Sequence, residues 1–356
     1  MVEQPGKSEL LSCLPRLYSM SVEETIKALP KVEQHVHIVG SVRPKTLLGL
    51  IEESDLDLPF ETLDDLKGFY DYSDFDHFLH VYSTVNDLIT HEKHYETITY
   101  QMLQNQHECN VRHVECIFSA YDHMDRGLDF HEMVSSINRA IRKAHRELGI
   151  SCNIRVDLVR NYGPEIGFKV LDEIRSKGDN IVGIDTGGSE YGYPPKPYAP
   201  VYAAAREQGL RLVAHQGEAA GVDYVWECIE NLNPERIGHG VAAASDPRLL
   251  SEIARRGISI ETCPISNLRT GAVKSLKEHP IRAFIDAGIK VSVNTDDPPM
   301  FGTDMNTEYL ALYNEMGFKV DELLDIGLDS IETSFLSEDE KTRLAKQFRY
   351  EYDKLL

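Results

Sequence analysis

Short apolar segments recur along the chain, and each is followed by a stretch in which apolar residues have helical spacing. The apolar segments that predict β-strands are 32–38, 111–118, 151–159, 181–186, 210–216, 236–241, 258–263 and 289–294. Most are nearly continuous in apolar character and rich in β-branched residues, which is typical of parallel strands buried on both faces. Intervening helices are predicted at 131–148, 164–177, 198–208, 246–256 and 278–287, with a helix start at Asp246-Pro247.

This alternation predicts an α/β fold, a (β/α)8 TIM barrel, with an open doubly wound sheet as the structural alternative. The long interval between the first two strands, about residues 41–110, breaks the regular spacing and is rich in Phe, Tyr and Asp. It predicts inserted lid helices over one end of the barrel. We expect residues 1–356 to form a single domain that includes this helical insertion.

Composition narrows the possible partners. Lys and Arg number 37 against 58 Asp and Glu, so the formal net charge is −21. Such a charge disfavours binding to nucleic acid and to anionic membranes. The chain has neither an apolar stretch of about 18 residues nor a signal-peptide core. Six scattered cysteines without a CxxC pair indicate thiols in a reducing compartment, so the expected location is cytoplasmic. The oligomeric state stays open.

Ionisable residues gather where predicted strands end. They are His35 and His37 after strand one, His215 and Glu218 after strand five, His239 after strand six, and Asp296 and Asp297 after strand eight. The carboxyl ends of barrel strands form the active-site face, and a spacing of two directs His35 and His37 to one side. Each feature alone is weak, because an HxH pair is usually incidental and Asp-Asp-Pro is usually a turn. Together they predict a functional site.

The chemistry of this cluster favours one ion. Three neutral imidazoles and one carboxylate suit Zn²⁺ or a similar transition metal better than Mg²⁺ or Ca²⁺. A catalytic zinc keeps a position open for water and lowers the pKa of that water. We assign as ligands of one Zn²⁺ per chain His35, His37, His215 and Asp296. Glu218 is then expected to shuttle protons, His239 to orient the hydroxide formed from that water, and Asp297 to recognise the substrate. The ten other histidines are expected to be structural or solvated.

A different known zinc motif, H-x-E followed by P-C-x-x-C, must also be considered. His113-Val114-Glu115 supplies the first half, but the chain contains no P-C-x-x-C. The match is therefore incidental, and His113 is expected within the second strand.

From about Leu29 to the C-terminus the sequence resembles the adenosine deaminase family. The segments that carry the resemblance are LPKVEQHVHIVGS (29–41), GIDTGGSE (183–190), AHQGE (214–218), RIGHG (236–240), CPISNLRTGAV (263–273) and VNTDDPPMF (293–301). The TGAV and NTDDP segments favour the nucleoside branch over the adenine-base branch. The resemblance implies a (β/α)8 barrel, one zinc, and conversion of a purine nucleoside, adenosine or 2′-deoxyadenosine, to inosine-type product and ammonia.

The resemblance also implies roles for individual residues. It implies metal binding by the four assigned ligands, protonation of purine N1 by Glu218, and polarisation of the hydroxide by His239. Asp297 would hydrogen-bond N7, and the backbone N–H of Gly188 would face N3. The matching lid stretch contains Phe75, Phe78, Leu79 and Tyr82. Packing of a helix on the barrel explains any one of these four equally well.

The sequence departs from the family pattern on the sugar side. The family usually has Asp, which contacts the ribose 5′-hydroxyl, where this chain has Val39. Where the family usually has His-Ala-Gly-Glu, this chain has Gln216 in place of the alanine. Where the family usually has Asp or Asn after the glycine that follows strand four, this chain has Ser189 after Gly188. A 5′-modified adenosine, of the 5′-methylthioadenosine, 5′-deoxyadenosine or aminofutalosine type, is therefore the alternative substrate.

Two other function classes are less favoured. Two-metal hydrolases of the wider amidohydrolase superfamily generally bridge their ions with a Lys ending strand four, and 181–188 contains no Lys. A non-catalytic barrel would be expected to lack Glu218, His239 or Asp296, but all three are present.

Overall fold

The computed structural model describes residues 20–54, 58, 60, 62–70, 75–177 and 179–355. Its strands are β1 Lys31–His37, β2 Val111–Phe118, β3 Ser151–Asp157, β4 Ile181–Asp185, β5 Arg211–Gln216, β6 Arg236–His239, β7 Ser259–Thr262 and β8 Val291–Val293. All neighbouring pairs are parallel and follow the order β1 to β8. A parallel bridge between Val36 and Asp296 joins the two ends. The predicted barrel is confirmed as nearly closed, and the open-sheet alternative is wrong.

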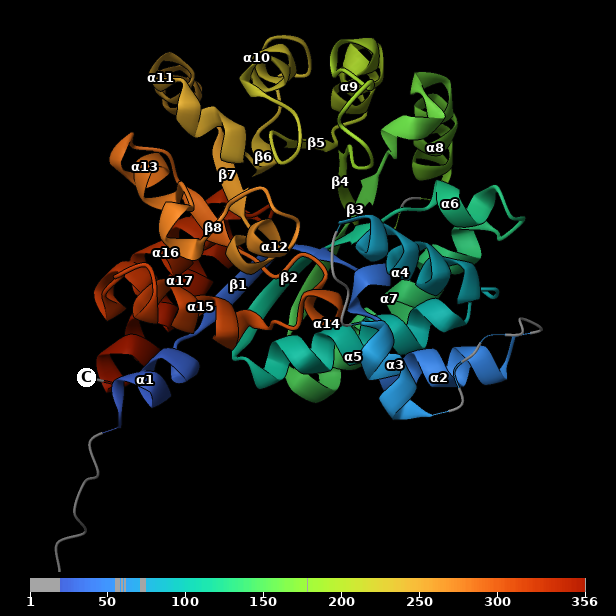
Figure 1. The fold of residues 1–356 in the computed structure, drawn as a ribbon, viewed down its shortest axis with the longest axis horizontal. Helices are drawn as coiled ribbons and strands as arrows, with labels where there is room; N and C mark the ends of the chain where they lie inside the picture. Colours follow the sequence, from blue (N-terminus) through green and yellow to red (C-terminus); the bar gives the residue numbers. More distant parts are fainter. Residues whose placement is uncertain are drawn as a thin grey trace, which may run out of the picture.

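Helices surround the strands (Figure 1). They are α1 Val22–Ala28, α2 Pro44–Glu52, α3 Leu63–Phe69, α4 Phe75–Leu88, α5 His94–Glu108, α6 Tyr121–Met124, α7 Phe130–Leu148, α8 Pro164–Lys177, α9 Ala199–Glu207, α10 Val222–Asn231, α11 Pro247–Arg256, α12 Pro264–Arg269, α13 Ile281–Asp286, α14 Pro298–Phe301, α15 Met305–Asn314, α16 Val320–Thr333 and α17 Glu338–Leu355. None of those that the structure describes is long and apolar enough to span a membrane.

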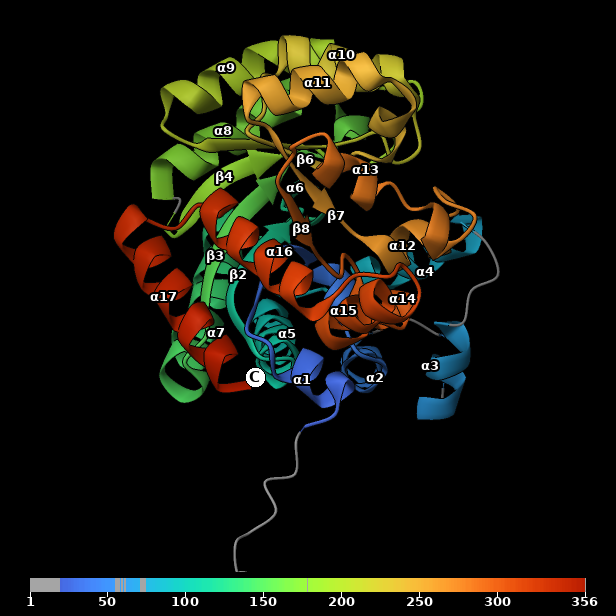
Figure 2. The ribbon, with the colours of Figure 1, turned by 90° about the vertical axis from the view of Figure 1, so that its left-hand side faces the viewer.

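The helices of the predicted insertion at 41–110 pack in two different places. Helices α2, α3 and α4 lie together beside the barrel (Figure 2). The fourth helix, α5, packs on β2 and α7, where the connecting helix of the first strand–helix unit belongs. Its apolar positions are spaced like those of the other barrel helices, and only its packing partners distinguish it from the three helices before it.

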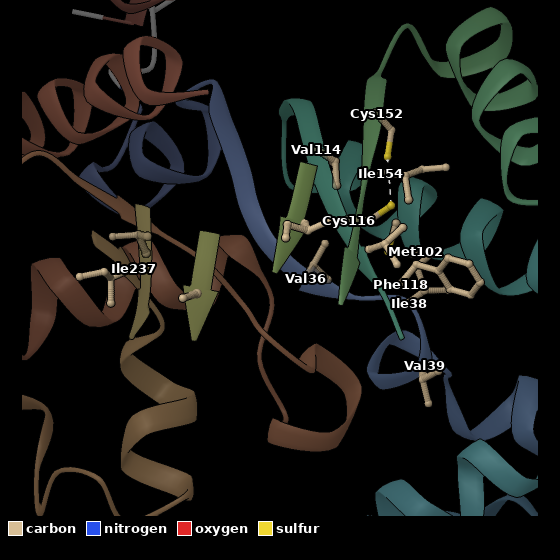
Figure 3. Packing of buried hydrophobic residues seen from close by; sticks show 14 of the residues in the cluster. Val36, Ile38, Val39, Met102, Val114, Cys116, Phe118, Cys152, Ile154 and Ile237 are labelled. Carbon is tan, nitrogen blue, oxygen red and sulfur yellow. Dashed lines mark hydrogen bonds between the residues drawn. The ribbon is translucent and has the colours of Figure 1, made fainter. Parts of the chain in front are cut away.

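A layer of buried apolar side chains joins β2 and β3 to the helices outside them (Figure 3). Met102 of α5 and Phe118 of β2 belong to this layer. Cys116 and Cys152 face one another across the two strands, with their sulfur atoms 3.6 Å apart. The five cysteines that the structure describes are all buried free thiols, as the sequence predicts for them.

Buried charged side chains from five strands pair with one another inside the barrel. Arg155 pairs with Asp185 and Glu261, and Arg236 pairs with Glu115 and Glu261. All five side chains are essentially inaccessible to solvent. Buried charges of this kind require mutual pairing, because their removal from water costs several kcal/mol per ion. Two of these carboxylates, Asp185 and Glu261, also reach the histidines above them.

Candidate metal and catalytic centre

Strand ends at β1 and β8 bring three of the proposed ligands together. The backbone N–H of His37 donates to Asp296 O, and Asp296 N–H donates to His35 O, both over 2.9 Å. Asp296 and His239 have left-handed backbone conformations, with φ of 62° and 63°. Residues other than glycine rarely adopt this region, and such strain concentrates at functional sites.

Carboxylates behind two of the imidazoles determine where their protons lie. His35 Nδ1 is 2.8 Å from Glu261 Oε2, and His215 Nδ1 is 3.0 Å from Asp185 Oδ1. An ionised carboxylate only accepts hydrogen bonds, so each Nδ1 carries a proton, and Nε2 is the nitrogen whose lone pair each ring would supply to an ion. Against the effect of burial, the Asp296 and Glu261 carboxylates raise the pKa of His35 to about 10, so an ion at His35 Nε2 would replace a proton there. Burial, acting against the nearby Asp185 charge, lowers the pKa of His215 to about 3 and keeps that imidazole neutral.

These lone pairs converge with one carboxylate oxygen. Asp296 Oδ1 lies 3.4 Å from His35 Nε2 and 3.2 Å from His37 Nε2, and His37 Nε2 lies 3.2 Å from His215 Nε2. Asp296 Oδ2 is already held by the Ser266 hydroxyl at 2.7 Å. Protein nitrogen and oxygen ligands bind zinc at about 2.0–2.2 Å, so ligand atoms that share one ion lie about 3 Å apart, and the donor set and its spacing fit this ion.

His239 lies in the same cluster. Ligand atoms of His35, His215, His239 and Asp296 all lie within 4.8 Å of one another and could hold a metal ion. The cluster therefore contains four imidazoles and one carboxylate. Which of His37 and His239 completes the set depends on where their ring protons lie.

Glu218 stands beside His239 with one of its oxygens already occupied. Its Oε1 accepts from the Thr270 hydroxyl at 2.9 Å and from Asn267 Nδ2 at 3.3 Å. Its Oε2 lies 3.7 Å from His239 Nε2. Burial raises the pKa of Glu218, so the carboxyl is disposed to hold a proton. That proton belongs on Oε2, the oxygen that has no other donor among these contacts.

Asp297 is buried against the turn after β1. A Cβ added at Gly40 would lie 1.6 Å from Asp297 Oδ1, so only glycine permits this approach. Asp297 Oδ1 is buried without a hydrogen-bond partner. Burial, followed by the charge of Asp296, raises the pKa of Asp297 to about 8. A neutral carboxyl can donate a hydrogen bond as well as accept one.

Glu190 holds the loop that carries Glu218. Its carboxylate accepts four consecutive backbone N–H groups, those of residues 217 to 220, at 2.9–3.2 Å. The Gln216 side chain adds a fifth hydrogen bond at 2.7 Å. Glu190 follows β4, whereas the loop follows β5, so the carboxylate ties two neighbouring strand ends together.

The helix α4 reaches this end of the barrel. The Phe78 ring stacks on Phe301 of α14, with centroids 4.9 Å apart. Burial, followed by the charge of Asp297, raises the pKa of the Tyr82 phenol well above its usual value, which sets Tyr82 near the site. Phe75 and Leu79 also lie on α4, but their side chains fall outside the described residues.

The sugar-side candidates lie in two turns. Val39 begins the single turn η1, Val39–Ser41, and is 2% exposed. Figure 3 shows its side chain on the turn after β1, apart from the other labelled side chains. The Ser41 hydroxyl donates to His37 O at 2.7 Å, so its hydrogen is engaged. Gly188 has φ of 81°, and a Cβ there would lie 2.4 Å from Asn161 Oδ1.

Comparison with known proteins agrees with this arrangement. The family model described as adenosine deaminase matches residues 30–350. The chain belongs to the adenosine deaminase family. Members of this family are hydrolytic deaminases that act on C–N bonds, so the protein is an enzyme of this type.

Characterised relatives in the family differ in their named substrates. An adenine deaminase of Acinetobacter baylyi is 33% identical over 90% of this chain and 97% of its own length. An aminodeoxyfutalosine deaminase of Streptomyces coelicolor is 35% identical over 90% of this chain and 84% of its own length.

Solved structures repeat the fold. The adenine deaminase of Arthrobacter aurescens superposes with a TM-score of 0.86 at 28% identity, covering 90% of this chain and 98% of that one. An amidohydrolase of Burkhoderia ambifaria with bound zinc gives 0.86 at 26% identity, covering 96% of both chains. The family is metal-dependent, and the buried cluster is where this deaminase could bind its metal.

Sequence reasoning missed the residues behind the site. Glu261 and Asp185 orient His35 and His215, Glu190 holds the Glu218 loop, and Asn267 contacts Glu218. A signal was present for two of them, because Asp185 and Glu261 are charged residues in segments that are predicted to be buried strands.

Proposed function

We propose that this deaminase hydrolyses a 6-aminopurine nucleoside, adenosine or 2′-deoxyadenosine, to the 6-oxopurine nucleoside and ammonia. One Zn²⁺ would be held by His35, His37, His215 and Asp296. The observation that carries the proposal is the convergence of imidazole lone pairs and one carboxylate oxygen beside Glu218, a carboxyl disposed to hold its proton. When bound, zinc would lower the pKa of a water molecule and supply the nucleophile at neutral pH.

The residues of the chain would prepare the purine for attack at C6. Glu218 Oε2 would donate its proton to N1, which withdraws electrons from C6. His239 would orient the attacking oxygen through Nε2. Water adds its oxygen to C6 and gives up two protons: one reaches the amino group, which leaves as ammonia when the C6–N bond breaks, and the other restores the proton that Glu218 gave to N1.

Recognition of the base would rest on Asp297 and Gly188. A neutral Asp297 carboxyl could donate to N7, and its Oδ1 lacks another partner. The backbone N–H of Gly188 would face N3. The bound purine would be covered from the side of α4 by Phe75, Phe78, Leu79 and Tyr82.

A second candidate substrate is an adenosine with an apolar or extended 5′ substituent. Val39 supports it, because a valine offers no acceptor to a ribose hydroxyl. A buried hydroxyl without a partner costs about 1–3 kcal/mol, whereas a buried CH₂-sized group contributes about 0.8 kcal/mol. The nearby Ser41 hydroxyl donates elsewhere, although its oxygen could still accept.

A panel of 6-aminopurines tests both candidates. The kcat/KM of adenine, adenosine, 2′-deoxyadenosine and 5′-methylthioadenosine would be compared in the wild type and in Val39→Asp, with Val39→Ala as the control that removes bulk without adding an acceptor. We expect nucleosides to exceed adenine, and Val39→Asp to shift preference towards adenosine. Preference for adenine contradicts the nucleoside proposal. A hundredfold wild-type preference for adenosine, or an unmoved ratio in Val39→Asp, contradicts the 5′ proposal.

A further inference from the structure

A chain of buried polar groups runs from the start of α13 to His239 and lies outside the ligand set. It begins at Ile281 N–H, passes through His279 and Asn267, and ends at His239 Nδ1. His279 is 4% exposed, and Asn267 and His239 are 0% and 1% exposed. Buried polar groups are nearly always hydrogen-bonded, so each donor in this chain is expected to face an acceptor.

The first link fixes the proton of His279. Ile281 N–H can only donate, and it points at His279 Nδ1 at 3.3 Å. His279 Nδ1 is therefore the bare nitrogen of the ring, and Nε2 carries the hydrogen. Burial lowers the pKa of His279 to about 3, so the ring is neutral and has only this one N–H.

The second link fixes the orientation of the Asn267 amide. His279 Nε2–H needs an acceptor, and it lies 3.2 Å from Asn267 Oδ1. The amide NH₂ then points the other way, towards His239 Nδ1 at 3.1 Å and Glu218 Oε1 at 3.3 Å. The reversed amide would place its NH₂ against the His279 N–H and its oxygen against Glu218 Oε1, so these two contacts fix the orientation.

The third link distinguishes His239 from the other imidazoles. His239 Nδ1 faces an N–H donor, whereas His35 Nδ1 and His215 Nδ1 face carboxylates. A neutral ring that accepts at Nδ1 carries its hydrogen on Nε2. That nitrogen has no lone pair for a metal, and it lies 3.7 Å from Glu218 Oε2.

We propose that His279 and Asn267 are positioning residues that hold His239 in its Nε2–H tautomer, so that His239 donates a hydrogen bond into the site and leaves the metal to the other imidazoles. This inference deepens the proposed function and rests on it for the kinetic consequence. The same Asn267 amide holds Glu218 Oε1, so one side chain sets the proton position of one catalytic group and the orientation of another.

The direct test reads the tautomer without using turnover. Zinc-loaded protein would be labelled with ¹⁵N-histidine, and two-bond ¹H–¹⁵N correlation would distinguish the protonated from the bare nitrogen of each ring. The His239 signal is the one lost in His239→Gln. We expect Nε2 protonated and Nδ1 bare. A proton on Nδ1 of His239 in the wild type overturns the proposal, whatever substrate the enzyme uses.

Asn267→Asp is the matching variant, because it keeps the shape and replaces a donor with an acceptor. His239 should then move its proton to Nδ1, and kcat should fall about 10²–10⁴-fold while KM changes far less. His279→Leu should lower kcat, and His279→Gln, which keeps a donor for Asn267 Oδ1, should restore most of it. An unchanged tautomer or unchanged kcat in Asn267→Asp overturns the proposal.

The control is Asn138→Asp, the same change at another buried asparagine. Asn138 lies on α7, away from the metal cluster, and its Nδ2 donates to Asp179 O at 2.9 Å. It should leave the His239 tautomer and kcat unchanged, and an equal loss of kcat there contradicts a specific role for Asn267. If the wild type deaminates no nucleoside, the proposed function fails, while the NMR result still decides the tautomer.

Discussion

At the scale of single residues, the role of each imidazole depends on the partner of its Nδ1 atom. His35 and His215 have a carboxylate there, and His239 has an amide donor. The same residue type therefore presents a lone pair in two cases and an N–H in the third. The strand position alone cannot distinguish these uses, because all three residues lie at a strand end or within two residues of one.

Glu218→Gln separates binding from chemistry. The amide keeps the size of the side chain and an oxygen for Thr270, but it has no acidic proton for N1. We expect kcat to fall by at least about 10²–10⁴-fold, with the metal retained and KM changed far less. Steady-state kinetics and metal analysis of the purified variant check this. Turnover close to the wild-type rate would remove Glu218 from the mechanism.

Gly40→Ala tests the close approach of the first turn to Asp297. Because the added methyl would lie 1.6 Å from Asp297 Oδ1, the carboxyl or the turn must move. We expect kcat/KM to fall at least about tenfold, which corresponds to a loss of about 1.4 kcal/mol. Gly49→Ala is the control, because a Cβ there meets nothing within 4 Å. Equal activity in the two variants would contradict a tight contact at Asp297.

The sequence predicts the four proposed ligands but not the residues that hold them in place, for a physical reason. His35, His37, His215 and Asp296 follow strands that could be recognised from apolar pattern, and barrel strands converge at one end. The partner of His35, by contrast, is 226 residues away on β7. That pairing depends on which side chains meet inside the closed barrel, and one sequence carries no signal for it.

At the scale of elements, the loop after β5 takes its shape from the loop after β4. Glu190 gathers four successive N–H groups of the segment that carries Glu218. A glutamine at 190 would have an NH₂ group in place of one carboxylate oxygen, and this NH₂ would face backbone N–H groups that also donate. We therefore expect Glu190→Gln to lower kcat by about tenfold to a hundredfold, because small displacements of a catalytic group are costly.

The control for this change is Glu227→Gln. Glu227 also accepts a backbone N–H, that of Lys196 at 2.8 Å, but on the outer surface. Its variant should keep kcat within about twofold, since surface changes are usually small in effect. Crystal structures of both variants would show whether residues 216–220 move. A Glu190→Gln enzyme with full kcat would show that the Glu218 loop needs no such support.

Strands were easier to predict than the segment between the first two of them. All eight predicted strands lie within a few residues of the observed ones, because burial on both faces makes most of them nearly continuous in apolar character. Asp246 does cap α11, accepting Arg248 N–H at 2.9 Å. The interval at 41–110 was expected to be one insertion, and the packing of α5 on β2 and α7 was not visible in its composition.

At the scale of the whole molecule, the proposed ion would join β1, β5 and β8. A bridge between Val36 of β1 and Asp296, three residues after β8, closes the barrel, and Asp296 is one of the proposed ligands. A metal bound only by the folded state adds stability of about 4 kcal/mol at a thousandfold excess over Kd. We expect one ion per chain, and chelation should lower the melting temperature. Two ions per barrel would contradict the single-metal site.

The most direct test of the account is ammonia release by metal-stripped enzyme before and after addition of one equivalent of zinc. With adenosine, 2′-deoxyadenosine or 5′-methylthioadenosine as substrate, the account predicts no release from the stripped enzyme and one ammonia per purine consumed after zinc is restored. Release that survives exhaustive chelation, or none from any nucleoside after reconstitution, would contradict zinc-dependent deamination of a 6-aminopurine nucleoside.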